Sequence, residues 1–183
     1  MSWLPADNFR SAMALARFLG TAIIGLTLDL TTKVWAFAAL AEQVGDRPMR
    51  THAHQFIPGW LHFEVTTNEG AVFGLGEGNR WLFVAVSIAA IGFLTTLFAK
   101  SGRQRFYQII LGMLLAGVLG NMYDRVRFGY VRDMIHALPQ WPNLFPWIFN
   151  VADVLLCTGV GLLVLHSLLV GSEKEQQPAL QGD

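Results

Sequence analysis

The stretch FNVADVLLCTGVGLLVLHSLLV, residues 149–170, decides which class of fold this chain can adopt. The residues after Asp153 are uncharged and largely apolar, and about 20 such residues cross a ~30 Å hydrocarbon core as one helix. A carboxylate inside a membrane costs roughly 2.5–3.5 kcal/mol on insertion scales. The stretch therefore predicts a membrane-spanning helix. Because polar groups are costly at this depth, Asn150 and Asp153 at the start of the helix are predicted to have a functional role.

The composition of the whole chain agrees with a membrane protein. Its 183 residues are 53% hydrophobic and 14% charged, whereas soluble domains carry about 25% charged residues. The formal net charge is zero, so nothing in the charge balance suggests nucleic acid as a partner. The length allows one membrane domain over residues 1–183, and the single cysteine, Cys157, excludes an internal disulfide.

Three more apolar segments are long enough to span a membrane, namely residues 18–41, 81–99 and 106–123. Asp29 and Lys33 interrupt the first, but their i, i+4 spacing places both on one helix face, where they can neutralise each other. A cleaved signal peptide is the alternative for this segment, because arginines precede it and the sequence ALA at 39–41 resembles a cleavage site. The charged pair within the run favours an anchor helix instead.

Basic residues in the short loops predict the orientation. The loop KSGRQR, residues 100–105, carries three basic residues and no acid, which is typical of a cytoplasmic turn. Both termini are then cytoplasmic, and residues 42–80 and 124–148 lie on the other side of the membrane. Arg125, Arg127 and Arg132 in the second of these outer segments oppose the charge rule, so we expect them to bind partners or substrate.

The two outer segments contain signs of a small β platform. Residues 59–67 alternate between apolar and polar side chains, which predicts a half-exposed strand, and residues 129–134 are a second candidate. Residues 138–149 (LPQWPNLFPWIF) hold three prolines, so a regular helix is not expected there. The predicted fold is thus a membrane all-α protein with a small β part: a four-transmembrane-helix bundle carrying an extracytoplasmic β platform.

Three carboxylates are expected to converge beneath this platform. Asn121 and Asp124 lie i, i+3 at the outer end of the third span, and Asn150 and Asp153 lie i, i+3 at the outer start of the fourth. Asp133 is in the segment that joins them. A single aspartate at a helix end is often a cap or a charge partner, but three with two asparagines at one depth indicate a functional site.

Two close carboxyl groups suit acid–base catalysis without a cofactor. They cannot both ionise cheaply, so the pair retains one proton near neutral pH. The charged member then acts as a base on water, while the protonated one polarises a scissile carbonyl and later protonates the leaving amine. This is the chemistry of an aspartic peptidase, and no metal or cofactor is expected to take part.

Other sites fit the residues less well. His52, His54, His62 and Glu64 are metal-ligand types, but their spacing is loose and no HExxH motif is present. A small non-enzymatic membrane protein, such as a proton-coupled transporter using the same acids, is the alternative function. A transporter is expected to carry polar groups through the membrane midplane or internal repeats, and the second and fourth spans are nearly featureless there.

Four motifs, in order along nearly the whole chain, resemble the lipoprotein signal peptidase (signal peptidase II) family of bacteria. They are DLTTK at 29–33, NEGAVF at 68–73, GNMYDR at 120–125 with GYVRD at 129–133, and FNVAD at 149–153. Two positions depart from the family pattern. Ala116 precedes Gly117 where the family usually has two glycines, and Arg132 stands where the family usually has an apolar residue.

The resemblance implies four transmembrane helices, an extracytoplasmic β-cradle and an aspartyl dyad in the bacterial cytoplasmic membrane. The implied reaction is cleavage of a prolipoprotein just before a cysteine that carries a diacylglyceryl group, so the expected partners are this lipidated substrate and membrane lipid.

The residues of the implied site can be assigned to three roles. Asp124 is next to Arg125 and one turn from Arg127, which would hold it ionised and structural, whereas Asp133 in a strand points away from Arg132. The resemblance also favours Asp133. We therefore expect Asp133 and Asp153 to be catalytic; Asn68, Gly70, Asn121, Arg125 and Asn150 to bind substrate; and Asp29, Lys33 and Asp124 to support the site.

Overall fold

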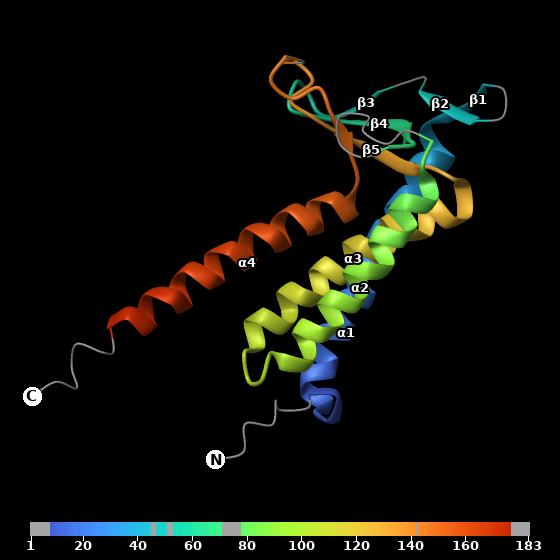
Figure 1. The fold of residues 1–183 in the computed structure, drawn as a ribbon. Helices are drawn as coiled ribbons and strands as arrows, with labels where there is room; N and C mark the ends of the chain where they lie inside the picture. The colour runs from blue at the N-terminus through green and yellow to red at the C-terminus, as the bar shows by residue number, and fades with distance from the viewer. Residues whose placement is uncertain (1–7, 45–46, 51–52, 71–77, 142, 177–183) are drawn as a thin grey trace, which may run out of the picture.

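The computed structural model describes residues 8–44, 47–50, 53–70, 78–141 and 143–176 (Figure 1). Within these residues, four helices are long and apolar enough to cross a membrane, which confirms the predicted number of spans. They are α1 (Ala12–Leu40), α2 (Arg80–Lys100), α3 (Arg105–Phe128) and α4 (Val151–Gln176), and a short 3-10 helix, η1 (Asn8–Arg10), precedes them.

Helices α1, α3 and α4 extend beyond the predicted apolar runs, and α4 does so by continuing past residue 170 to Gln176. The first begins at Ala12 rather than near residue 18, because the Ser11 hydroxyl caps it by accepting a hydrogen bond from the Ala14 N–H at 3.3 Å. The third continues past residue 123 to Phe128 and ends at Gly129, whose φ of +91° is the left-handed conformation that suits glycine. The last turn of α3 therefore carries charged residues that were expected in the outer segment.

Small residues allow α3 to pack closely against α1 and α4. A Cβ on Gly117 would lie 2.6 Å from the Ala152 carbonyl oxygen, so only glycine permits α4 to approach this closely. Ala116, the departure from the family's two glycines, is fully buried against α1. A Cβ on Gly25 of α1 would lie 2.8 Å from the Ala116 Cβ. A glycine on the facing helix thus provides the room that the Ala116 methyl group needs.

In the described part of the chain, the strands form two antiparallel sheets at one end of the helices. A two-stranded sheet pairs β1 (Ala41–Val44) with β2 (Arg47–Arg50). A four-stranded sheet has the order β3-β4-β5-β6. Its strands are β3 (His54–Ile57), β4 (Leu61–Asn68), β5 (Val131–Ala137) and β6 (Ile148–Phe149). The start of α1 and the end of α4 both lie at the opposite end of the molecule from these sheets (Figure 1).

Both predicted strands exist, with one correction to the expected alternation. The run 59–67 corresponds to β4 and the run 129–134 to β5, which begins later and continues further. The pairing register between these strands shifts between Phe63 and Thr66, so Glu64 and Val65 are both buried although they are neighbours. A register shift of this kind gives one strand an extra residue and ends strict alternation. Residues 138–141 and 143–147 contain no helix, as the prolines predicted.

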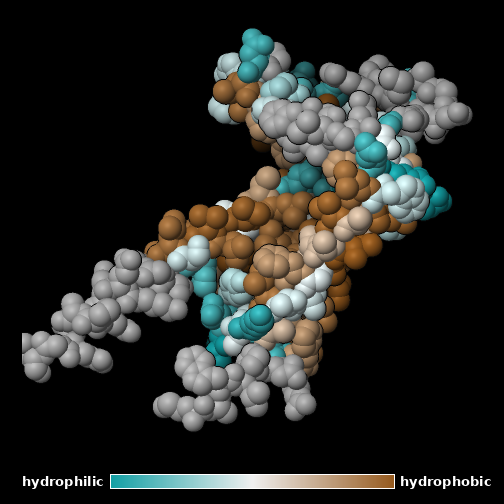
Figure 2. All heavy atoms as spheres, in the orientation of Figure 1, coloured by the Kyte–Doolittle hydropathy of each residue, from teal (hydrophilic) through white to brown (hydrophobic). Residues whose placement is uncertain are grey.

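The distribution of polarity agrees with a protein that crosses a membrane. Hydrophobic side chains cover much of the visible surface of the helices, while hydrophilic side chains gather on the sheets and near the opposite end (Figure 2). Many large apolar side chains on the helices are exposed, among them Ile23, Trp35, Val86 and Leu168. In water such a surface would be unfavourable, and lipid is the environment that suits it.

Candidate active site

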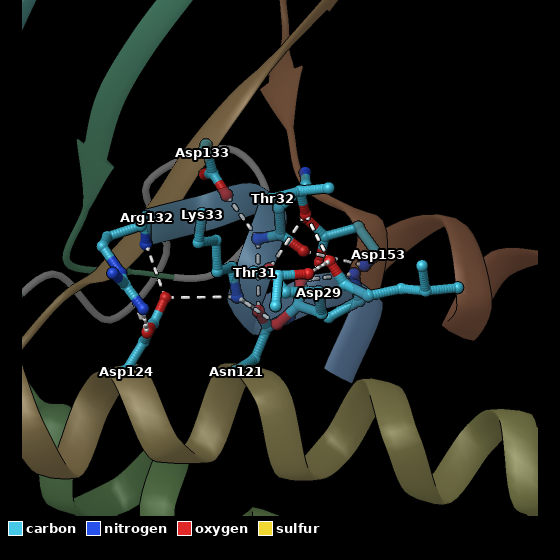
Figure 3. Close-up of polar contacts among 12 residues, drawn as sticks. Asp29, Thr31, Thr32, Lys33, Asn121, Asp124, Arg132, Asp133 and Asp153 are labelled. Carbon is cyan, nitrogen blue, oxygen red and sulfur yellow. Dashed lines mark hydrogen bonds and ion pairs between the residues drawn. The ribbon is translucent and has the colours of Figure 1, made fainter. Parts of the chain in front are cut away.

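The polar residues singled out in the sequence lie together where α1, α3, β5 and the start of α4 meet (Figure 3). Asn121 and Asp124 project from the last turns of α3, and Asp133 comes from β5. Asp153 lies in the first turn of α4. Asp124 and Asp133 are almost completely buried. The structure thus brings the three carboxylates to one level, as their spacing predicted.

Asn150 connects Asp133 to Asp153. Its side-chain Nδ2 donates to Asp133 Oδ1 at 2.6 Å, and its backbone N–H donates to Asp153 Oδ2 at 3.1 Å. Its Oδ1 in turn accepts from the Asp153 N–H at 3.0 Å, which is the usual contact of a helix-capping asparagine. One residue therefore touches both carboxyl groups and fixes their separation.

The environments of the two carboxyl groups differ. Burial, followed by the negative charge of Asp153, raises the pKa of Asp133 from 3.8 to about 7, although hydrogen bonds from Asn150 and Asn68 oppose the change. Asp153 Oδ1 accepts from Asn121 Nδ2 at 2.8 Å, so both of its oxygens face N–H donors. Asp133 has N–H donors on both oxygens as well, so burial and the neighbouring Asp153 charge, rather than the pattern of donors, favour the retention of a proton by Asp133 near neutral pH.

Asp124 is bound by different cations from those expected. Arg132 donates to Asp124 Oδ1 through Nη2 at 2.8 Å and Nε at 3.1 Å, and its backbone N–H donates to Oδ2 at 3.0 Å. Lys33 Nζ lies 3.1 Å from the same Oδ2. The expected pairing with Arg125 and Arg127 is wrong: Arg125 donates to the Gly70 carbonyl, and the Arg127 guanidinium lies 5.4 Å from the centre of the Phe128 ring.

Arg125 points instead toward the end of β4. Its Nη2 donates to the Gly70 carbonyl at 3.0 Å, and its guanidinium lies 4.7 Å from the centre of the Phe83 ring. Asn68 Nδ2 lies 3.4 Å from Asp133 Oδ2, while Asn68 Oδ1 accepts from the Gly70 N–H at 3.0 Å. These residues therefore border Asp133 from the sheet side. The continuation of their motif at 71–73 lies outside the described residues.

Asp29 and Lys33 form the ion pair that their spacing predicted. Lys33 Nζ lies 2.8 Å from Asp29 Oδ2, and neither side chain is exposed. Asp29 Oδ1 accepts from the Ala152 N–H at 2.9 Å, one residue before Asp153. Lys33 also donates to Asn121 Oδ1 at 3.1 Å. The pair thus joins α1 to both α3 and α4 directly beside the carboxyl groups (Figure 3).

The described histidines that were considered as metal ligands do not form a metal-binding cluster with Glu64. Glu64 Oε2 lies 2.8 Å from Nδ1 of His136, a residue that the sequence pattern did not point to. His62 of β4 lies opposite His136 of β5 in the register of the sheet. His54 lies on β3, and His52 is outside the described residues. Among the residues that the structure describes, no three His, Cys, Asp or Glu side chains are placed to hold one metal ion.

The contact between Arg132 and Asp124 was not predicted from the sequence. The signal was present, since an arginine that alternates with Asp133 on a strand must point toward the opposite face. Its partner, Asp124, could not be identified because it lies on a different element, α3. The opposing direction of Arg132 and Asp133 was predicted, but the partner was not.

Comparison with known proteins gives one consistent result. A family model described as signal peptidase (SPase) II matches residues 21–169. The lipoprotein signal peptidase of Symbiobacterium thermophilum is 36% identical over 151 residues, covering 81% of this chain and 92% of that protein. That of Syntrophomonas wolfei is 30% identical over 164 residues, covering 89% and 99% respectively.

Two solved structures, each described as a bacterial membrane enzyme, share the fold. One is 27% identical with a TM-score of 0.73 over 98% of both chains. The other is 28% identical with a TM-score of 0.69, over 90% of this chain and 97% of its own. With the family match over most of the chain, these likenesses show that this protein belongs to the signal peptidase II family of membrane proteases.

Proposed function

We propose that this protein is an aspartic endopeptidase that removes the signal peptide from prolipoproteins in the bacterial cytoplasmic membrane. It cleaves just before the cysteine that carries a diacylglyceryl group. Family membership supports the substrate class, since its relatives are named lipoprotein signal peptidases. The observation that carries the aspartic mechanism is that one residue, Asn150, bonds to both Asp133 and Asp153.

The two acids have different roles because Asp133 is protonated and Asp153 is ionised in this mechanism. Asp153, whose oxygens accept N–H bonds, takes a proton from the attacking water. Asp133, with a pKa of about 7, donates a hydrogen bond to the scissile carbonyl oxygen, where negative charge develops. As the tetrahedral intermediate collapses, Asp133 protonates the leaving amine, and the proton that Asp153 gained from water then passes to Asp133. The products are a free carboxyl and a free amine, and the dyad returns to its starting state.

Arg125 and its neighbours are proposed to hold the peptide. Arg125 Nε is buried and has no hydrogen-bond partner among the residues described, so it can donate to a peptide carbonyl. Asn68, Asn121 and Asn150 contact the two carboxyl groups, and Gly70 contacts Asn68 and Arg125; these four residues complete the proposed substrate contacts. None of these contacts needs a metal or a cofactor.

The depth of the dyad suits a substrate anchored in lipid. The basic loop at 100–105 favours cytoplasmic termini, and the dyad lies at the opposite end of the helices, which is then the extracytoplasmic side. Asp153 begins an apolar helix, so it lies near the boundary between lipid and water. A diacylglyceryl chain can remain in the bilayer there while the neighbouring peptide bond reaches the dyad.

The direct test uses purified protein in lipid or detergent with two forms of one prolipoprotein. The form carrying diacylglyceryl on its cysteine should be cut immediately before that cysteine, as identified by mass spectrometry. The unlipidated form should remain intact. Equal cleavage of both forms would contradict the substrate assignment, and a cut elsewhere would contradict the proposed position.

A further inference from the structure

The side-chain amide of Asn121 stands between a buried cation and the dyad. Its Nδ2 donates to Asp153 Oδ1 at 2.8 Å. Its Oδ1 accepts from Lys33 Nζ at 3.1 Å and from Asn150 Nδ2 at 3.2 Å. The two ends of an amide have nearly the same shape but opposite hydrogen-bonding character. The groups around Asn121 therefore decide whether a donor or an acceptor faces Asp153.

Lys33 is a strong determinant of that choice. An ammonium group has three donors and no acceptor, so only the oxygen of the Asn121 amide can face it. Its hydrogen bond is charge-assisted, which makes it stronger than the neutral bond from Asn150. Lys33 Nζ also forms ion pairs with Asp29 and Asp124, so its charge is engaged by groups of the protein on three sides.

The surroundings hold the Lys33 cation in place. Asp29 is tied to the Ala152 N–H of α4, and a Cβ on Gly120 of α3 would overlap the Asp29 carboxylate. Asp124 is held by Arg132. The formal charges of Asp29, Asp124, Lys33 and Arg132 cancel, which lets a buried cation persist. This balanced group spans two helices and one strand, α1, α3 and β5, and contacts α4 through the Ala152 N–H, so it fixes the ammonium relative to the dyad.

We propose that Lys33 is a positioning residue for the peptidase: through Asn121 it keeps an N–H donor against Asp153 and so leaves the shared proton on Asp133. This inference rests on the aspartic mechanism proposed above. A reversed Asn121 amide would place an oxygen against Asp153 Oδ1, a contact that only a protonated carboxyl satisfies. The proton would then be on the wrong acid for polarising the scissile carbonyl. The Lys33 charge also acts on Asp133, whose pKa it lowers against the effect of burial.

The test compares two proteins that differ only in Lys33. Asp29→Asn is the reference, because it keeps Lys33 with Asp124 and Asn121. Asp29→Asn/Lys33→Met removes the cation and gives the buried group the same net charge as in the wild type, whereas the reference carries one extra positive charge. With a lipidated prolipoprotein, we expect the pH optimum of the reference to lie at or slightly below that of the wild type. In the double variant both limbs of the kcat profile should move to higher pH, kcat at pH 7 should fall about tenfold or more, and KM should stay the same.

Two further variants report on the route through Asn121. Asp29→Asn/Lys33→Gln restores a neutral donor, so its pH profile should lie between those of the reference and the Met variant. Asn121→Ala, which leaves the charged residues intact, should displace the profile as Lys33 removal does. If the Met and Gln variants fail to fold, by size-exclusion profile and melting curve, Asn121→Ala alone decides the question. An unchanged profile in folded Asn121→Ala would overturn the proposal.

The same assays separate this inference from the function on which it rests. Asp133→Asn and Asp153→Asn are measured alongside, and both should be inactive if the aspartic mechanism holds. Activity in either would contradict the mechanism itself. Inactivity in both, with a wild-type pH profile in the Lys33 or Asn121 variants, would contradict only the positioning role.

Discussion

Arg132 and Asp133 are adjacent in β5, and their side chains contact opposite partners: Arg132 binds Asp124 of α3, whereas Asp133 accepts from Asn150 at the start of α4. Strand β5 therefore carries a proposed catalytic acid, Asp133. The residue just before it, Arg132, attaches the strand to the helix bundle. A displacement of β5 would disturb both contacts at once. The stability of the bundle and the geometry of the dyad are coupled through these two residues.

Arg132→Met should destabilise the protein. The substitution removes two charge-assisted hydrogen bonds from Asp124, a buried carboxylate whose remaining partners among the described residues are Lys33 and one backbone N–H. A loss of about 3 kcal/mol is expected when one partner of a buried pair is removed. Arg127→Met is the matched control, because Arg127 is exposed on the same helix end as Asp124 and should change stability by less than about 0.5 kcal/mol. Melting curves in detergent measure both, and equal curves would mean that Arg132 does not hold Asp124.

Asp29→Ala and Lys33→Ala should each lower the melting temperature, and the double variant should lose less than the sum. Removing one partner leaves a buried charge unpaired, at a cost of about 3–5 kcal/mol. Lys33→Ala should be the more damaging, since it leaves two carboxylates, Asp29 and Asp124, without their shared cation. Melting curves of the wild type, both single variants and the double variant give the coupling free energy. Strictly additive losses would show that the pair does not interact.

Asp133 should make the protein less stable as the pH rises. Its folded pKa of about 7 is above the ordinary value of 3.8, so between these values the folded protein binds more protons than the unfolded chain. The free energy of unfolding therefore falls as the pH rises from about 4 to 7 and levels off above that. Asp133→Asn removes this dependence. At pH 8 the variant should be more stable than the wild type, and the difference should shrink toward pH 5.

A melting-temperature difference between Asp133→Asn and the wild type that is independent of pH would contradict this reading. Asp153→Asn is a useful comparison. The negative charge of Asp153 is one of the causes that raise the Asp133 pKa, so its removal should move the stability transition to lower pH.

Chelators and thiol reagents should leave activity unchanged. The proposed chemistry uses only two carboxyl groups and water, and Cys157 is a free cysteine exposed on α4. Cleavage of the lipidated substrate is measured with and without a chelator, and again with Cys157→Ser. Complete inhibition by the chelator, reversed by added zinc, would point back to His54, His62 and Glu64.

Local patterns were sufficient to predict the spans, β4, β5 and the convergence of Asp124, Asp133 and Asp153, whereas the choice of Asp133 as the partner of Asp153 also used the family resemblance. Uncharged runs of suitable length have one stable arrangement in a membrane, and i, i+3 pairs at the ends of neighbouring helices must lie at the same depth. The sheet pairing of β3 and β6, the register shift at Phe63–Thr66 and the partner of Arg132 were not predicted. Each depends on contacts between distant positions, such as His136 with Glu64, for which a single sequence carries no local signal.

The boundary of α3 illustrates the same limit. Charges after residue 123 suggested that the helix left the membrane there, but charged residues continue a helix readily, and Gly129 ends it. This difference of about one turn decided the partner of Asp124. On the helix, Asp124 faces Lys33 and Arg132, and Arg125 faces Gly70.

The most direct test of the account is the rate of cleavage of a diacylglyceryl-modified prolipoprotein by three folded variants, Asp133→Asn, Asp153→Asn and Asp124→Asn. An amide keeps the shape of each carboxyl group but cannot share the proton of the dyad, so the first two should lose at least about a thousandfold in kcat. Asp124→Asn should lose stability but retain measurable cleavage at a temperature where it stays folded. Substantial activity in Asp133→Asn, together with none in folded Asp124→Asn, would show that the dyad has been assigned to the wrong pair.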